Sequence, residues 1–154
     1  MTQILLVSEV SSLRVRAGGP ATANMWLLMD GREFPAPHWN DFVVVVLGWW
    51  AEAILSLVRS TSSHETVPFM DGPYSVEVSK TSTGLLRFRA LEGVGRTNEI
   101  AVSDGQVIPF VLELISQSRN ILAECKRQAW WTTDAEKLES SVAVLEQAVA
   151  GLLS

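Results

Sequence analysis

The sequence predicts one α+β domain over residues 1–154, with an antiparallel sheet of about six strands packed by one Trp- and Val-rich helix and a C-terminal helical pair. Length is the first reason, because 154 residues fit one domain and bury a core without a metal or disulfide staple. Composition is the second, because 47% hydrophobic and 19% charged residues exclude an intrinsically disordered chain. The third is patterning, since strand-like alternation and helical spacing occupy separate stretches.

The first strands are marked by alternation and by turn residues. Apolar and basic residues alternate over 13–16, which predicts a strand with one wet face. Residues 17–20 break that pattern, and 25–29 form a second apolar run. The Asp-Gly pair at 30–31 favours a type I′ hairpin, because both central positions need positive φ. Residues 32–34 are then the return strand.

A long helix is predicted over 38–60, after prolines that end the sheet. Asn40 and Asp41 lie near its start, where their side chains are expected to satisfy free N–H groups. The β-branched run 43–46 locally favours a strand. Spacing at steps of three and four favours the helix, and its main stripe is Trp39, Phe42, Val43, Val46, Trp50, Ile54 and Leu57.

The second group of strands contains the clearest hairpin. Residues 61–65 are polar and predict a loop. Alternation over 74–78 and 86–90, separated by a Ser-, Thr- and Gly-containing turn, predicts two paired strands. Residues 98–102 are expected to form the last strand.

Two helices are predicted to complete the chain. The first spans 108–129, with Pro109 suited to its first turn. The second begins at Thr133, where Thr-Asp-Ala-Glu matches a capping box. Its apolar residues repeat at steps of four and three and predict a narrow packing stripe, made of Leu138, Val142, Leu145, Val149 and Leu152.

No motif in the sequence indicates a catalytic, cofactor or metal site. His38 and His64 are separated by a whole helix, and no zinc-type spacing connects them to Cys125. Cys125 lies on the apolar face of its helix, which is typical of an inert structural thiol. Phosphate-loop and nucleophile-elbow motifs are absent, and the aspartates of the Asp-Gly turns are expected to bond their own backbone. The sequence therefore predicts a protein that is not an enzyme.

Charge and hydropathy exclude some classes of partner and favour one cellular compartment. A net charge of −5 and a pI near 5.0 argue against a nucleic-acid binder. The longest uncharged apolar run, 42–51, is too short to cross a membrane as a helix. The first three residues carry no basic side chain, so no signal peptide is expected, and a single cysteine suits a reducing cytosol. A cytoplasmic protein without membrane contact is expected.

Tryptophan and arginine supply the candidate contact residues. The adjacent pairs at 49–50 and 130–131 cannot both face one core, because neighbouring helical residues point about 100° apart. These rings either close seams between helices or anchor a partner interface. The arginines at 14, 16, 87 and 89 lie on predicted wet strand faces, paired with Glu9 and Glu77 or forming a docking patch for an acidic partner.

Residues 26–78 carry a family resemblance. The pattern is Asp-Gly-x-x-Phe-Pro at 30–35, Trp-x-Asp-Phe at 39–42, Leu-Gly-Trp-Trp at 47–50 and Phe-Met-Asp-Gly-Pro-Tyr at 69–74. It resembles small bacterial proteins grouped with polymorphic-toxin immunity families, and it covers about one third of the chain. The resemblance implies a cytosolic α+β protein that binds and blocks a cognate toxin, with no catalytic residues.

Three hypotheses follow. The first is a non-enzymatic immunity protein that occludes a secreted toxin domain. Its expected contact residues are Trp49, Asp71, Tyr74, Arg14, Arg16, Arg87 and Arg89. The second is a small-ligand-binding or enzyme domain, with a pocket lined by Trp39, Tyr74 and the turn aspartates. The third is a structural homo-oligomer, a homodimer joined through the stripe of the C-terminal helix.

Overall fold

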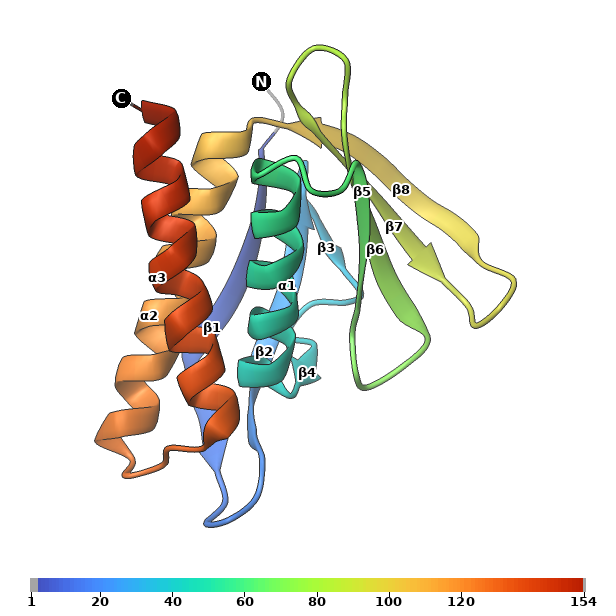
Figure 1. Ribbon diagram of the computed structural model, residues 1–154. Helices are drawn as coiled ribbons and strands as arrows, with labels where there is room; N and C mark the ends of the chain where they lie inside the picture. The colour runs from blue at the N-terminus through green and yellow to red at the C-terminus, as the bar shows by residue number, and fades with distance from the viewer. Residues whose placement is uncertain (1–2, 154) are drawn as a thin grey trace.

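The strands of the computed structural model, which describes residues 3–153, form two antiparallel sheets and not one (Figure 1). Sheet A has the order β1-β2-β3 with β4 beside β2, and contains β1 (Ile4–Val15), β2 (Ala21–Met29), β3 (Arg32–Phe34) and β4 (Asn40–Asp41). Sheet B has the order β5-β6-β7-β8, and contains β5 (His64–Pro68), β6 (Tyr74–Lys80), β7 (Leu86–Glu92) and β8 (Asn98–Gly105). The prediction of a single sheet of about six strands is wrong.

The division has a physical origin in the central helix. Helix α1 (Val43–Val58) follows β4 and packs against both sheets, so the strands before and after it pair separately. The sheets approach each other near Ile4 and Gly105, where a side chain in place of Gly105 would lie 3.3 Å from the end of Ile4. Alternation predicts that a strand exists but not which strand it pairs with. It also missed the short β4 and the polar edge strand β5.

The three helices and both sheets share one continuous core, which confirms the α+β class. Helices α2 (Val107–Arg127) and α3 (Thr133–Leu153) lie beside α1 (Figure 1). Trp50 of α1, Phe88 of β7 and Phe110 of α2 meet with ring centroids 4.8 to 6.4 Å apart. The hairpin of β6 and β7 pairs as predicted, and α3 begins at Thr133 as predicted.

The start of α1 differs from the prediction. The helix begins at Val43 and not at His38, because His38 has a φ of 54° and residues 40–41 pair with β2. Asp41 accepts the N–H of Phe42 and the indole N–H of Trp39, but its other partners, the backbone N–H groups of residues 70 and 71, lie about 30 residues away, so it is not an ordinary cap. Local sequence cannot show that a helix-start carboxylate has distant partners.

The C-terminal stripe packs within the chain. Leu138, Val142, Leu145 and Val149 are buried where α3 meets α1 and α2, whereas Leu152 is 54% exposed. Most of the surface that suggested a homodimer therefore already has an intramolecular partner. No helix within residues 3–153 combines the length and the apolar character needed to cross a bilayer.

The outer strands are protected in different ways. The backbone N–H and the hydroxyl of Ser8 on β1 both donate to the side-chain oxygen of Gln117 on α2, at 3.0 and 2.7 Å. Strand β5 is short and ends at Pro68, which has no N–H to donate. Strand β8 carries a register shift opposite Ala90 and Leu91.

Candidate functional site

A buried carboxylate links the two sheets. Asp41 is 1% exposed, and its oxygens accept hydrogen bonds from the indole N–H of Trp39 at 3.0 Å and from the backbone N–H groups of Phe42, Met70 and Asp71 at 2.7 to 3.3 Å. Two of these donors precede α1 in the sequence, and the other two follow it. The carboxylate is fully used in holding the turn after β5 against the start of α1, so it is not available to a substrate.

Four aromatic rings pack beside Asp41, and with it they form the inter-sheet junction, made of Phe34, Trp39, Asp41, Phe69 and Tyr74. Trp39 contacts Tyr74 at 5.3 Å and Phe69 at 6.4 Å between ring centroids. Phe34 contacts Tyr74 at 5.7 Å and Phe69 at 6.0 Å, and all four pairs are edge-to-face. The pocket expected between Trp39, Tyr74 and the turn aspartates is therefore occupied by rings, which argues against the ligand-binding hypothesis.

The turn after β5 presents its tip to solvent. Met70 is 47% exposed, and Asp71 is exposed although its N–H bonds to Asp41. Within residues 3–153 the Asp71 carboxylate has no ion-pair partner, while Tyr74 is half-buried in the junction. The structure thus places Asp71 on the surface and makes Tyr74 mainly a packing residue.

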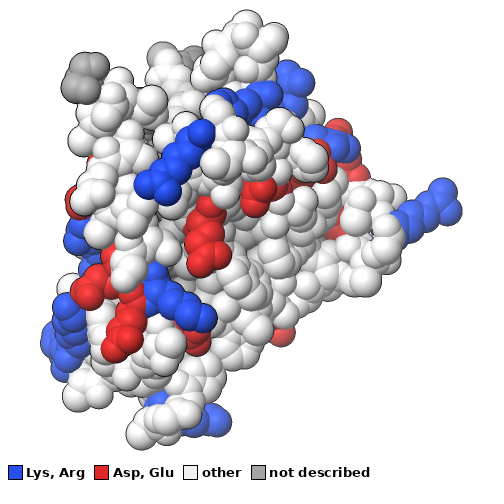
Figure 2. Space-filling model, in the orientation of Figure 1, with Lys and Arg blue, Asp and Glu red and all other residues white. Residues whose placement is uncertain are grey.

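A shallow groove runs between α1 and β5, and we call it the α1–β5 groove. Trp49 lies partly exposed on its α1 side, and Glu52 of α1 and Glu65 of β5 flank it. Figure 2 shows acidic side chains on this face, over α1 and β5. In the described part of the chain, neither Glu52 nor Glu65 has a basic group within 4.0 Å. The remaining lining residues are Ala53, Ser56, Thr66 and Pro68.

The arginines of sheet B are neutralised by neighbouring strands. Arg87 forms a bidentate pair with Asp104 at 2.8 and 3.0 Å, which lowers the pKa of that carboxyl group and raises the pKa of the guanidinium. Arg89 contacts Glu99 at 2.7 Å and Glu77 at 2.8 Å. The expected pairing across β6 and β7 is therefore confirmed for Arg89 and Glu77.

The four candidate arginines do not form one basic surface. Arg14 lies on β1 of sheet A and donates to backbone carbonyl oxygens of Ser11 and Leu13, and Arg16 lies in the turn after β1. Strands β1 and β7 belong to different sheets. The expected partner Glu9 instead pairs with His38 at 2.5 Å.

Metal and thiol chemistry find no support in the residues that the structure describes. No group of three His, Cys, Asp or Glu side chains among residues 3–153 is arranged to hold a metal ion. His38 lies edge-on to Trp26 at 5.5 Å, and its contact with Glu9 raises the pKa of the imidazole. Burial raises the pKa of the Cys125 thiol to about 11, so the thiol is protonated and unreactive near neutral pH.

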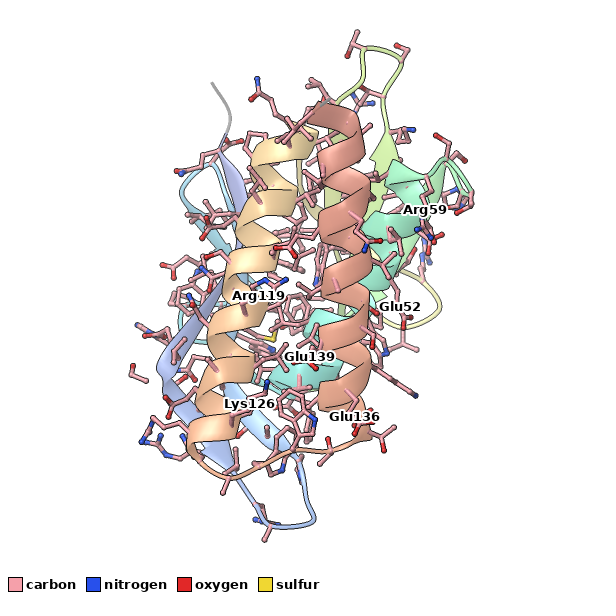
Figure 3. The ribbon with its side chains drawn as sticks, turned by 60° about the vertical axis from the view of Figure 1, so that its left-hand side comes forward. Glu52, Arg59, Arg119, Lys126, Glu136 and Glu139 are labelled. Carbon is pink, nitrogen blue, oxygen red and sulfur yellow. The ribbon has the colours of Figure 1, made fainter. Side chains whose placement is uncertain are left out.

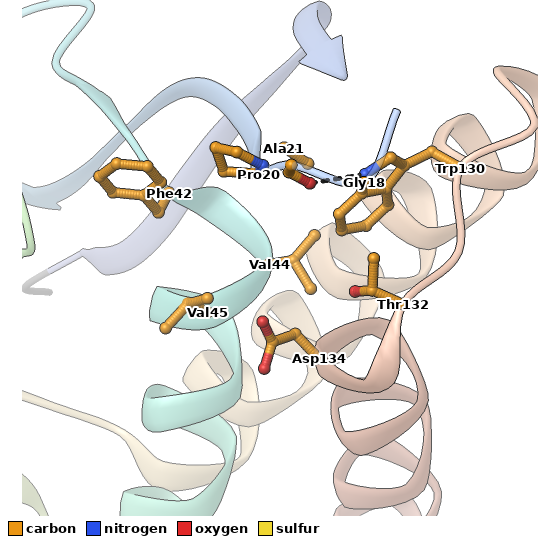
Figure 4. Close-up of a pocket in the computed structure, with 10 residues that line it drawn as sticks. Gly18, Pro20, Ala21, Phe42, Val44, Val45, Trp130, Thr132 and Asp134 are labelled. Atoms are coloured by element: carbon orange, nitrogen blue, oxygen red, sulfur yellow. Dashed lines mark hydrogen bonds between the residues drawn. The ribbon is translucent and has the colours of Figure 1, made fainter. Parts of the chain in front are cut away.

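The second tryptophan pair closes a seam. The indole N–H of Trp130 donates to the carbonyl oxygen of Gly19 at 3.0 Å, and Lys126 lies 4.7 Å from the ring centre of Trp131. Figure 4 shows Trp130 at the wall of a crevice between the β1–β2 turn, the start of α1 and the start of α3. This pair joins elements within the chain, as the packing interpretation predicts.

The outer surface of the helical pair is crossed by ion pairs. Arg119 contacts Glu146 at 2.5 Å and Lys126 contacts Glu139 at 3.2 Å, which connects α2 to α3. Figure 3 shows Arg119, Lys126 and Glu139 on this side, with Glu52 on α1 and Arg59 directly after the end of α1. The paired helical surface therefore differs from the α1–β5 groove, whose carboxylates are free of such partners.

Sequence reasoning identified Trp49 but missed Glu52 and Glu65. The available signal was a glutamate that interrupts an otherwise apolar helix, and it did not reveal that β5 brings a second carboxylate beside it. Comparison of the chain with protein-family models, curated proteins and solved structures gives no match.

Proposed function

We propose that this chain is a non-enzymatic binding protein of the toxin-immunity kind, which neutralises a bacterial toxin by covering the toxin's working surface. The carrying observation is the contrast between buried and exposed acids. Asp41 is saturated by hydrogen bonds inside the junction, whereas Glu52 and Glu65 have no ion-pair partner within residues 3–153 and lie beside a partly exposed tryptophan. Such a surface supplies contact area and charge, and it contains no group arranged for a reaction.

The mechanism is occlusion. Unpaired carboxylates on a chain of net charge −5 accelerate encounter with a basic protein, because complementary charge steers diffusion. Tryptophan beside them supplies a large, rigid contact once the surfaces meet. The toxin is inhibited because its own surface is covered, and no covalent bond of the binding protein is formed or broken.

The test uses the C-terminal domain of a large secreted protein encoded beside this chain. We expect stoichiometric amounts of this chain to abolish the activity of that domain in solution and to protect cells that express it. A heat-denatured sample of the same chain is the control. Unchanged toxin activity at equimolar, native chain refutes the proposed function.

A further inference from the structure

Helix α1 keeps one stripe of residues out of the core. Its buried side faces α3 and both sheets, and it contributes Trp50 and Ile54 among others to the core. The opposite stripe is only partly covered or fully exposed, and we call it the α1 face. It consists of Val45, Gly48, Trp49, Glu52 and Ser56.

The structure leaves room for a side chain at Gly48. It lies in the middle of α1, and a Cβ atom added there would meet nothing within 4 Å. Glycine lowers helix stability relative to alanine at an exposed interior position. By contrast, an added Cβ at Gly72 would lie 3.0 Å from the Trp39 ring, so that glycine is needed by the fold. Gly48 leaves this part of the helix backbone without a side chain, so another molecule can approach the helix closely there.

Charge beside Gly48 indicates the character of that molecule. Glu52 lies one turn further along α1, and Glu65 faces it across the α1–β5 groove, both without ion pairs in residues 3–153. Trp49 follows Gly48 in the sequence and lines the same groove as the two glutamates, and its partly exposed ring suits a cation–π contact with arginine or lysine. The one cation on this stripe of the helix is Arg59, two turns beyond Glu52 and past the end of α1.

From these observations we infer that the α1 face and the α1–β5 groove bind a basic segment of the toxin, whose backbone approaches α1 closely at Gly48 while its cationic side chains contact Trp49, Glu52 and Glu65. This inference deepens the proposed function and rests on it. The backbone of the toxin segment can approach α1 closely because Gly48 has no side chain. The carboxylates of Glu52 and Glu65 supply charge complementary to a basic segment.

The experiment measures the affinity of the same secreted toxin domain by calorimetry for five chains. Gly48→Leu adds bulk at the proposed contact, and Gly151→Leu adds the same bulk to α3, where a Cβ also meets nothing within 4 Å. Glu52→Lys reverses charge in the groove, and Glu33→Lys reverses it on sheet A. The wild-type chain is the reference, and thermal unfolding checks that every variant is folded.

We expect Gly48→Leu and Glu52→Lys each to weaken binding by about tenfold or more, which is the effect typical of substitutions at the centre of an interface. Both control variants are expected to bind like wild type. Raising the salt concentration is expected to weaken wild type more than Glu52→Lys. If Gly48→Leu and Glu52→Lys both bind the toxin domain with wild-type affinity, this inference is overturned and the proposed function is not. A toxin domain that the wild-type chain does not bind overturns both.

Discussion

The inter-sheet junction and the α1 face come from the same stretch of sequence but have opposite properties. At the junction, Asp41 is held by hydrogen bonds from within the chain, and an added Cβ at Gly72 would lie 3.0 Å from the Trp39 ring. On the α1 face, Glu52 has no ion-pair partner among residues 3–153, and an added atom at Gly48 meets open space. In the junction, the polar group and the space are both taken up by the chain itself. On the α1 face, the carboxylate and the space beside the helix are left for the proposed partner.

This difference bears on the proposed resemblance to immunity families. Its motif segments supply all the residues of the junction, among them Phe34, Trp39 and Tyr74, which hold sheet A against sheet B. Only the segment Leu-Gly-Trp-Trp at 47–50 also contributes to the α1 face. In this chain such a motif therefore specifies packing between the sheets more than the proposed contact with a partner.

The largest effect is expected from Asp41→Ala. The substitution leaves the Trp39 indole and the amides of Met70 and Asp71 without their acceptor, so the free energy of unfolding is expected to fall by about 3 kcal/mol. Urea denaturation followed by circular dichroism measures the loss. Asp71→Ala is the matched control, because its carboxylate bonds nothing in the junction, and an equal loss in both variants would contradict the comparison.

Two glycine substitutions are expected to act with opposite sign. Gly72→Ala forces a side chain into a φ of 134° and against the Trp39 ring, which lowers the free energy of unfolding by about 2 kcal/mol. Gly48→Ala removes a helix-breaking residue in open space and raises the same quantity by about 1 kcal/mol. The same urea titration compares them, and destabilisation by Gly48→Ala would show a structural need for that glycine.

A third comparison separates binding from stability. Trp49→Ala is expected to weaken toxin binding by about tenfold, because a partly exposed ring is lost from the contact surface. Trp131→Ala, which loses the contact with Lys126 at the helical seam, is expected to leave binding unchanged. Calorimetric titration of both variants decides the matter, and equal weakening would place the interface elsewhere.

The smallest expected effect is a pH dependence at the surface of sheet A. The contact with Glu9 raises the pKa of His38 above 6.5. The ion pair therefore contributes its full stabilisation below pH 6.5, and this contribution disappears as the pH rises through the raised pKa of His38. The same contact lowers the pKa of Glu9 below 4.5, so the contribution also disappears as pH falls through that lowered pKa.

The melting temperature of wild type minus that of His38→Gln is therefore expected to be largest between about pH 4.5 and 6.5 and to shrink on both sides. Thermal unfolding at a series of pH values tests this window. A difference that stays constant across the series would mean that the ion pair does not contribute.

Local features of the fold were predictable, and long-range pairings were not. Asp30 and Gly31 both have positive φ, as the type I′ turn requires, and Trp50 and Cys125 are buried as their spacing predicts. The split into two sheets depends on pairings that no alternation encodes. The same limit applies to the site, because Glu52 and Glu65 are 13 positions apart and share a groove only through the packing of β5 on α1.

The hydrogen bonds from Ser8 to Gln117 have a consequence for self-association. A free strand edge recruits other chains and starts fibril growth. At Ser8 the recruiting N–H is already occupied by a side chain of α2, so another chain would first have to displace Gln117. Together with Pro68 at the end of β5, this disfavours edge-to-edge pairing between two copies of the chain.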